Sequence, residues 1–94
     1  MRDGSFEWDD AKADLNFANH RVTFEAATKA FRDRFGIERL DDRITYGEER
    51  FILIGMAGDT LLTIVYVERN GRRRLISARR ATRIEQDDYY TQTV

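Results

Sequence analysis

The chain has 94 residues, of which 41% are hydrophobic and 12% aromatic, and its formal net charge is −1. This length is typical of one domain, so we expect a single domain over residues 1–94, and the apolar share argues against intrinsic disorder. The absence of cysteine excludes disulfides and thiolate metal sites, and with His20 as the only histidine we expect no metal cofactor.

The amino-terminal segment predicts a short strand followed by a helix. Residues 1–5 lack the apolar core of a signal peptide and no run has the length of a membrane span, so we expect a cytoplasmic protein without a membrane partner. Residues 6–8 have strand character, and Asp9 or Asp10 can cap a helix that runs to about His20. Its predicted core-facing stripe has apolar residues at helical spacing: Ala11, Leu15 and Ala18. A neighbouring stripe carries polar side chains: Lys12, Asn16 and His20.

The remaining elements complete an α+β fold. Thr23 caps a second predicted helix with Gly36 as its left-handed stop, and its apolar face follows helical spacing: Phe24, Ala27, Phe31 and Phe35. Short β-rich runs then predict one antiparallel sheet, with strands at 37–40, 50–56, 61–69 and 72–78. A short carboxy-terminal helix is expected from about Thr82 through Tyr90. We therefore expect an antiparallel sheet with the two amino-terminal helices packed on it.

Two turns organise the predicted hairpins. Gly58 and Asp59 mark one turn, and Asn70–Gly71 is a stronger signal because both residues tolerate positive φ and favour a type I′ hairpin. Continued along the strands, this register places Arg79 on the face of Tyr66 and Ala78 on the opposite face. Both faces are apolar in the middle, so we expect one to be covered by the helices and the other by a terminal segment or a partner.

The second half of the chain carries a series of arginines. Residues 51–94 hold seven arginines, and no acidic residue interrupts them: 69, 72, 73, 74, 79, 80 and 83. Arg69 lies opposite Arg72 in the predicted register with Arg74 alongside, which costs a few tenths to about 1 kcal/mol unless an anion separates them. A phosphate suits this place because guanidinium groups bind phosphate oxygens in a bidentate way. The alternative is that these long side chains extend into water, and the sequence leaves both open.

Three stretches of the chain resemble the BrnT family of toxins. They are Phe6-Glu7-Trp8-Asp9 with Lys12-Ala13, Asn16, His20 and 22–26; Tyr46-Gly47-Glu48-Glu49-Arg50 with Ile54-Gly55; and Val65-Tyr66 with Ile76-Ser77-Ala78-Arg79-Arg80-Ala81. The resemblance spans nearly the whole chain in the same order. Two departures are the sequence Asn19-His20-Arg21 where the family usually has Lys-His-Gly, and a shorter loop at 57–60.

The resemblance implies a RelE-like fold and the function of a toxin in a type II toxin–antitoxin system. Such a toxin is a ribonuclease that cleaves RNA and inhibits translation and growth. The implied partner is a BrnA-like antitoxin, a DNA-binding protein of the ribbon-helix-helix class that is encoded beside the toxin and represses their shared promoter. The implied assembly has two toxin and two antitoxin chains, and operator DNA is contacted only through the antitoxin.

Metal-free RNA cleavage proceeds by attack of the 2′-hydroxyl on the neighbouring phosphorus, which needs a base, an acid and positive charge. His20 or Glu49 is the candidate base, although a histidine near a helix end or a glutamate before a strand is more often a surface group. The other candidate catalytic residues would stabilise the phosphate or the leaving oxygen: Lys12, Arg69, Arg79 and Arg80. Candidate RNA-binding residues are the remaining arginines of the strands and the helix start: Arg72, Arg74 and Arg83.

Two other functions stay open from the residues alone. The first is a non-catalytic module that binds RNA or a partner chain through the arginine-bearing strands, whose RNA affinity would depend on salt without producing a cut. The second is a structural interaction domain whose open sheet face docks a partner helix and has no affinity for RNA. The order of the family-like motifs favours catalysis over both.

Overall fold

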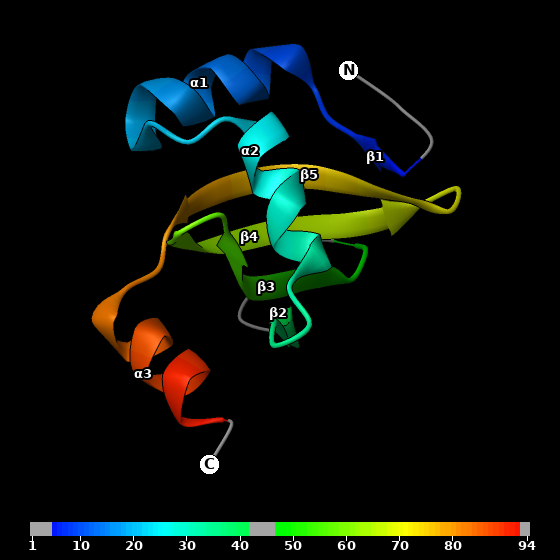
Figure 1. Cartoon of the computed structure of the whole chain (residues 1–94). Coiled ribbons are helices and arrows are strands. Elements are labelled where there is room, and N and C mark those ends of the chain that lie inside the picture. Colours follow the sequence, from blue (N-terminus) through cyan, green and yellow to red (C-terminus); the bar gives the residue numbers. More distant parts are fainter. Residues whose placement is uncertain (1–4, 42–46, 93–94) are drawn as a thin grey trace.

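Five strands form one sheet in the order β1-β5-β4-β3-β2, with helices on both sides of it (Figure 1). The computed structural model describes residues 5–41 and 47–92. Its elements in chain order are β1 (Phe6–Glu7), α1 (Asp10–His20), α2 (Phe24–Thr28), the 3₁₀ helix η1 (Lys29–Arg32), β2 (Ile37–Asp41), β3 (Arg50–Ala57), β4 (Thr60–Arg69), β5 (Arg72–Arg80) and α3 (Arg83–Thr91). The fold is therefore α+β, as the sequence predicts.

The sheet is mixed, which corrects the predicted antiparallel sheet. β2, β3, β4 and β5 pair in antiparallel fashion, but β1 lies parallel to β5 at the edge, with Phe6 opposite Arg73 and Glu7 opposite Arg74. A two-residue strand whose partner is more than sixty positions away has no local turn that sets its direction. The apolar pattern of residues 6–8 therefore indicates a strand but not its orientation.

The last hairpin has the predicted turn, and its predicted register holds from the Arg69–Arg72 pair to the Tyr66–Leu75 pair but not beyond. Asn70 and Gly71 both have positive φ, 51° and 76°, which confirms the type I′ turn. A register shift between Val65 and Tyr66 then changes the pairing, so that Ala78 lies opposite Ile64 rather than on the other face. Ala78 is fully buried in the cluster beneath the helices. The prediction was wrong here because the turn sets the register only up to the first bulge.

The same shift moves Arg79 to the opposite side of the sheet. Arg79 lies opposite Thr63, whereas the turn-derived register placed it on the face of Tyr66. One residue of slip exchanges the two faces of a strand because side chains alternate along it. Arg79 is consequently directed to the side of the sheet where α3 lies.

Helix α1 has the predicted bounds but faces the sheet with a different stripe. Asp9 caps it by accepting a hydrogen bond from the Ala11 N–H at 2.9 Å. The predicted apolar stripe is exposed, and Leu15 retains 61% of its accessible surface. The buried residue of α1 is instead Asn16, at 6% exposure. The apolar residues of α1 are too few to determine which face of the helix packs on the sheet. The polar residue Asn16 determines it.

The Asn16 amide makes three hydrogen bonds to the backbone. Its Nδ2 donates to the Val22 carbonyl at 3.0 Å and to the Ala78 carbonyl at 2.9 Å, and its Oδ1 accepts from the Ala78 N–H at 3.0 Å. These bonds satisfy the buried Asn16 amide and give the Ala78 N–H and carbonyl of β5 a hydrogen-bond partner. They join α1, the loop after it and the middle of the hairpin.

The second helix is shorter than predicted. α2 begins after its cap Thr23 and passes into η1, and the chain then turns at Asp33. The Asp33 carboxylate accepts from the Phe35 N–H at 2.9 Å and from the Met56 N–H of β3 at 2.8 Å. Phe35 therefore lies outside the helix and is 49% exposed, and Gly36 is not the left-handed stop. Helical spacing could not show that β3 supplies the hydrogen-bond donor that ends this segment.

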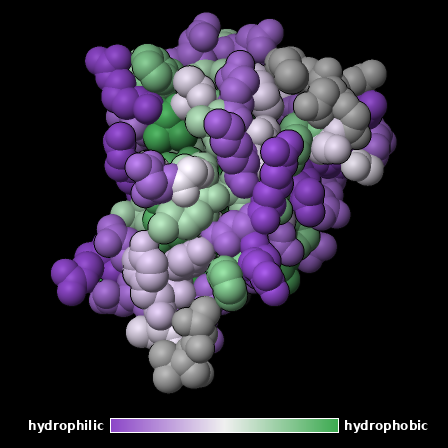
Figure 2. All heavy atoms as spheres, viewed as in Figure 1, coloured by the Kyte–Doolittle hydropathy of each residue, from purple (hydrophilic) through white to green (hydrophobic). Residues whose placement is uncertain are grey.

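Two hydrophobic clusters occupy the two sides of the sheet. The larger lies under α1, α2 and η1 and contains Trp8, Phe24, Ile64, Tyr66 and Leu75. The smaller contains Tyr89 of α3 with Ile54, Leu61 and Ala81. Elsewhere the surface in the view of Figure 1 is mostly hydrophilic, with a small hydrophobic area near its centre (Figure 2). Within residues 5–41 and 47–92, no helix combines the length and apolar character needed to cross a membrane.

Replacing Asn16 should weaken the fold strongly. Asn16→Ala leaves the Ala78 N–H and two carbonyls without their partner and opens a small cavity, so we expect the free energy of unfolding to fall by about 3 kcal/mol. Denaturant unfolding followed by circular dichroism measures this. Asn19→Ala, on the exposed side of the same helix, is the matched control and should change stability little. Equal stability of the two variants would contradict the anchoring role.

Candidate functional site

The polar stripe of α1 lines a cavity against β5. The cavity has a volume of about 250 Å³ and is lined by Lys12, Leu15, Asn16, Asn19, His20, Ile76 and Ser77. The Asn16 amide is already hydrogen-bonded to the backbone. The exposed Lys12 and His20 are therefore the groups of this cavity that can transfer a proton or supply positive charge. Neither forms an ion pair within the described part of the chain.

A second cavity begins where α1 ends. Its volume is about 190 Å³, and two arginines, Arg21 and Arg80, line it together with the hydroxyl-bearing Thr23 and Thr60. Arg21 is the left-handed cap of α1, with φ 59°, and its guanidinium lies 5.5 Å from the centre of the Phe17 ring. Arg80 ends β5. Among the described residues neither guanidinium has a carboxylate partner.

We call these four basic side chains, Lys12, His20, Arg21 and Arg80, the cationic edge. His20 lines the first cavity and the next residue, Arg21, lines the second, so the end of α1 contributes to both. Arginines and hydroxyl groups around one cavity form a site suited to phosphate oxygens, and an adjacent imidazole can move a proton. The sequence analysis did not predict Arg21 as a site residue and noted it only as a departure from the usual turn glycine. That departure was the available signal, because an arginine in a left-handed conformation is less favourable than a glycine.

Arg79 lies apart from the cationic edge and is neutralised. Its guanidinium makes two hydrogen bonds to Glu85 of α3, at 2.8 and 2.9 Å. The same carboxylate accepts from the Thr63 hydroxyl at 2.9 Å and from the Thr82 N–H at 2.8 Å, closing a capping box. The hydrogen bonds from Arg79, with those from Thr82 and Thr63, lower the pKa of Glu85 to about 2. Arg79 is therefore a structural cation that fixes α3.

Arg83 is also outside the edge. It begins α3 and pairs with Asp87 one turn later, at 3.2 Å, with both side chains well exposed. An exposed pair of this kind contributes at most a few tenths of a kcal/mol. Arg83 can still reach solvent and a ligand, but the structure does not bring it into either cavity.

The other predicted arginines lie at the far end of the hairpin. Arg69 pairs with Glu48 at 2.7 Å, and Arg74 pairs with Glu7 at 2.7 Å. The hydrogen bond from Arg69 also lowers the pKa of the Glu48 carboxyl. Two of the arginines that crowd together in the hairpin, Arg69 and Arg74, therefore pair with carboxylates of the chain itself. The sequence had left open whether a bound phosphate would lie there.

Arg72 and Glu49 belong to this same end of the molecule. Arg72 is half-buried beside the Asn70–Gly71 turn, and Glu49 is exposed just before β3. Arg80 follows Arg72 by eight positions along β5, a distance of about 26 Å along a strand. The structure therefore divides the predicted site: Lys12 and His20 line one cavity and Arg80 lines another, and neither Glu49 nor Arg69 lines either of them.

The described residues do not offer a metal-binding cluster. Within residues 5–41 and 47–92, no group of three or more histidine, aspartate or glutamate side chains is arranged to hold a metal ion. The acidic residues near the arginines are engaged as single carboxylates in ion pairs. The groups available at the cationic edge are donors of protons and hydrogen bonds.

The comparison with protein families decides the assignment. A family model described as the ribonuclease toxin BrnT of type II toxin–antitoxin systems matches residues 8–85. The chain belongs to the BrnT family. The match includes every residue of the cationic edge and the Arg79–Glu85 pair. None of the curated proteins searched for relatives matches this BrnT-family chain. Membership of a type II system implies a protein antitoxin as partner.

The charge of Glu85 should make stability depend on acid pH. Because the folded-state pKa is depressed from 4.5 to about 2, the contribution is complete above pH 4.5 and is lost as the pH falls toward 2. Glu85→Gln keeps an acceptor for the capping box but not the charge. We expect it to lower the free energy of unfolding by about 2 kcal/mol at neutral pH, with the difference from wild type shrinking below pH 4.5.

Thermal or denaturant unfolding between pH 2 and pH 7 measures this difference. Asp87→Asn removes another acid of α3 that pairs with an arginine, and because this pair is exposed the change should alter stability by only a few tenths of a kcal/mol. A Glu85→Gln difference that stays constant down to pH 2 would show that the ion pair contributes nothing through its charge.

Proposed function

We propose that this BrnT-family chain is a metal-independent endoribonuclease toxin with a RelE-like fold, which cleaves RNA at the cationic edge and thereby inhibits translation and growth. The observation that carries the proposal is the contrast between paired and unpaired cations. Within the described residues, Arg69, Arg74 and Arg79 pair with carboxylates of the chain, whereas the four residues of the cationic edge line two cavities and form no ion pair. Because RNA is the proposed substrate, the proposed place of action is the cytoplasm.

The proposed reaction is an internal transfer of the phosphoryl group. The 2′-hydroxyl loses its proton to His20 and attacks the adjacent phosphorus, so that a 2′-oxygen–phosphorus bond forms and the bond to the 5′-oxygen breaks. The products are a 2′,3′-cyclic phosphate and a 5′-hydroxyl end. Lys12, in the same cavity as His20, is positioned to give a proton to the departing 5′-oxygen. The two groups thus divide the roles of base and acid.

Arg21 and Arg80 are assigned to the phosphate itself. Charge on the phosphate oxygens increases as the five-coordinate phosphorus forms, and fixed cations stabilise that state more than the starting diester. The two guanidinium groups line one cavity from different elements, the cap of α1 and the end of β5. The hydroxyl groups of Thr23 and Thr60 add donors to the same cavity.

The antitoxin is the second part of the proposed function. We propose a BrnA-like antitoxin of the ribbon-helix-helix class that binds operator DNA, in an assembly of two toxin and two antitoxin chains. The family match supports a protein antitoxin of a type II system. Its class and the number of chains are tested by the mass of the purified complex in light scattering and by operator binding of the antitoxin alone.

Removing a cation from the edge should lower RNA cleavage without unfolding the protein. Arg80→Ala and His20→Gln should each reduce the rate of cleavage of an RNA oligonucleotide about tenfold or more. Arg80→Ala removes a group that stabilises the phosphate, and His20→Gln removes the group that accepts the proton. The rate should be unchanged by EDTA. Gel analysis of end-labelled RNA measures it, with thermal melts as the check on folding.

Arg69→Ala is the matched control, since it removes an arginine from the other end of β4–β5 and should cleave like wild type. Salt-dependent RNA binding without any cut product from the wild-type chain would contradict the ribonuclease proposal and support the non-catalytic module. Equal loss in Arg69→Ala and Arg80→Ala would place the site elsewhere.

Replacing Arg21 by glycine should raise stability and lower activity. Its positive φ strains a side-chain-bearing residue, so Arg21→Gly should raise the free energy of unfolding by about 0.5 to 1 kcal/mol. The same change removes a phosphate ligand and should slow RNA cleavage several-fold. Asn70→Gly relaxes the other left-handed residue outside the edge and should leave cleavage unchanged. An Arg21→Gly variant as active as wild type would remove Arg21 from the proposed site.

A further inference from the structure

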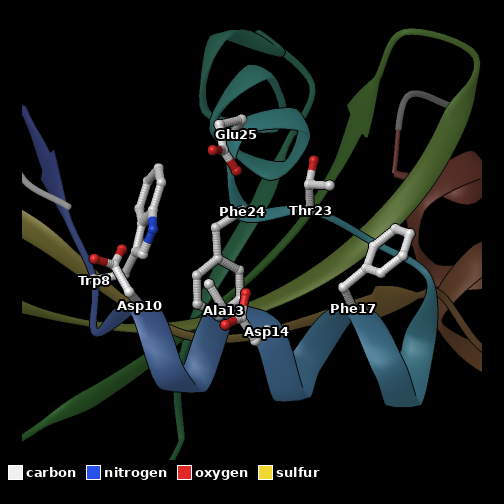
Figure 3. A pocket seen from close by; sticks show the side chains of 8 residues that line it. All are labelled: Trp8, Asp10, Ala13, Asp14, Phe17, Thr23, Phe24 and Glu25. Carbon is white, nitrogen blue, oxygen red and sulfur yellow. The ribbon is translucent and has the colours of Figure 1, made fainter.

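A groove lies between α1 and α2. Its volume is about 440 Å³, and it is lined by Trp8, Asp10, Ala13, Asp14, Phe17, Thr23, Phe24 and Glu25. Figure 3 shows Trp8 at one end, Phe17 at the other and Phe24 between them. Trp8 and Phe24 are buried and meet edge to face at 5.7 Å, so the floor of the groove is rigid and aromatic.

The rim of this groove is acidic. Asp10 and Asp14 come from α1 and Glu25 from the first turn of α2, and all three carboxylates are exposed (Figure 3). Asp10 and Glu25 also stabilise the first turns of their helices through the helix dipole. Asp14 lies in the middle of α1 and has no such role. Within the described residues, neither Asp14 nor Glu25 forms an ion pair or a side-chain hydrogen bond.

We infer that this groove is a docking site for the antitoxin, and that its occupant is a polypeptide segment with an apolar side chain flanked by lysine or arginine. The aromatic floor fits an apolar anchor, and the rim complements the flanking cations. RNA does not fit this charge, because its phosphates would face three carboxylates. The inference rests on the antitoxin partnership that the type II family implies.

The position of the groove explains how its occupant would silence the toxin. Phe17 ends the groove, and the guanidinium of Arg21 lies on the Phe17 ring at 5.5 Å. Thr23 lines both the groove and the cavity that holds Arg21 and Arg80. A segment bound over Phe17 therefore contacts Arg21 and borders the phosphate cavity. Docking at the groove and loss of RNA access are coupled by these shared residues.

The test uses the purified full chain and the protein encoded by the neighbouring gene, titrated by calorimetry. The double variant Asp14→Lys with Glu25→Lys should weaken binding about tenfold or more and reduce its dependence on salt. Phe17→Ala should weaken binding by a similar factor through loss of the apolar contact. Glu68→Lys carries the same kind of charge reversal on the exposed hairpin and is the matched control. It should bind like wild type.

The double variant Asp14→Lys with Glu25→Lys should still cleave RNA when the antitoxin is absent. A wild-type chain that does not cleave RNA would count against the proposed ribonuclease and not against the groove. Three results would overturn the inference. One is antitoxin binding by the double variant as tight as that of Glu68→Lys. The second is no binding to the wild-type chain. The third is dimerisation of the free chain that the double variant abolishes, which would assign the groove to a second copy.

Discussion

The buried amide of Asn16 holds α1 against β5. The positions of the residues of the cationic edge depend on that attachment. Its three hydrogen bonds reach the Val22 and Ala78 backbone from one side chain. With the amide fixed, the residues one turn before and after it, Lys12 and His20, face the same strand. The helix must then end where its next residue, Arg21, meets the end of β5. One polar anchor thus sets the geometry of both cavities.

Ion pairs separate the arginines by role. Burial of opposite charges side by side fixes a helix or an edge strand, as in Arg79 with Glu85 and Arg74 with Glu7. A paired guanidinium has lost most of its attraction for a phosphate, because the carboxylate already occupies its donors. The fold therefore uses some of its arginines in ion pairs, and among the described residues Arg80 has no carboxylate partner. Counting cations in the sequence cannot make this distinction, because their partners come from distant segments.

Local chemistry predicted much of the fold. Asp9 and Thr23 cap helices as expected, the last helix begins close to the expected Thr82, and the Asn70–Gly71 turn sets the end of its hairpin. What could not be predicted depends on contacts far apart in sequence. The bulge that moves Ala78 under the helices is one example.

The site was predicted less well than the fold for the same reason. The polar stripe of α1 correctly grouped Lys12 with His20, since helical spacing is local. Helical spacing alone does not indicate that the helix turns this stripe toward β5. Glu49 and Arg69 were placed beside these residues by their chemical type alone, and about 26 Å of strand separates the two ends. Arg21 was missed because its value lies in a backbone conformation that sequence spacing does not report.

The conformation of Arg21 connects the two surfaces that α1 presents, the acidic groove and the cavity shared with Arg80. A glycine would suit the left-handed end of the helix better, so an arginine here carries a conformational cost. Its side chain leaves the helix between Phe17, at the end of the acidic groove, and the cavity it shares with Arg80. Under the two proposals, a partner that binds the groove and a substrate that binds the cavity would compete for the surroundings of one residue. Such inhibition would need no movement of the sheet, because α1 presents both surfaces within one turn.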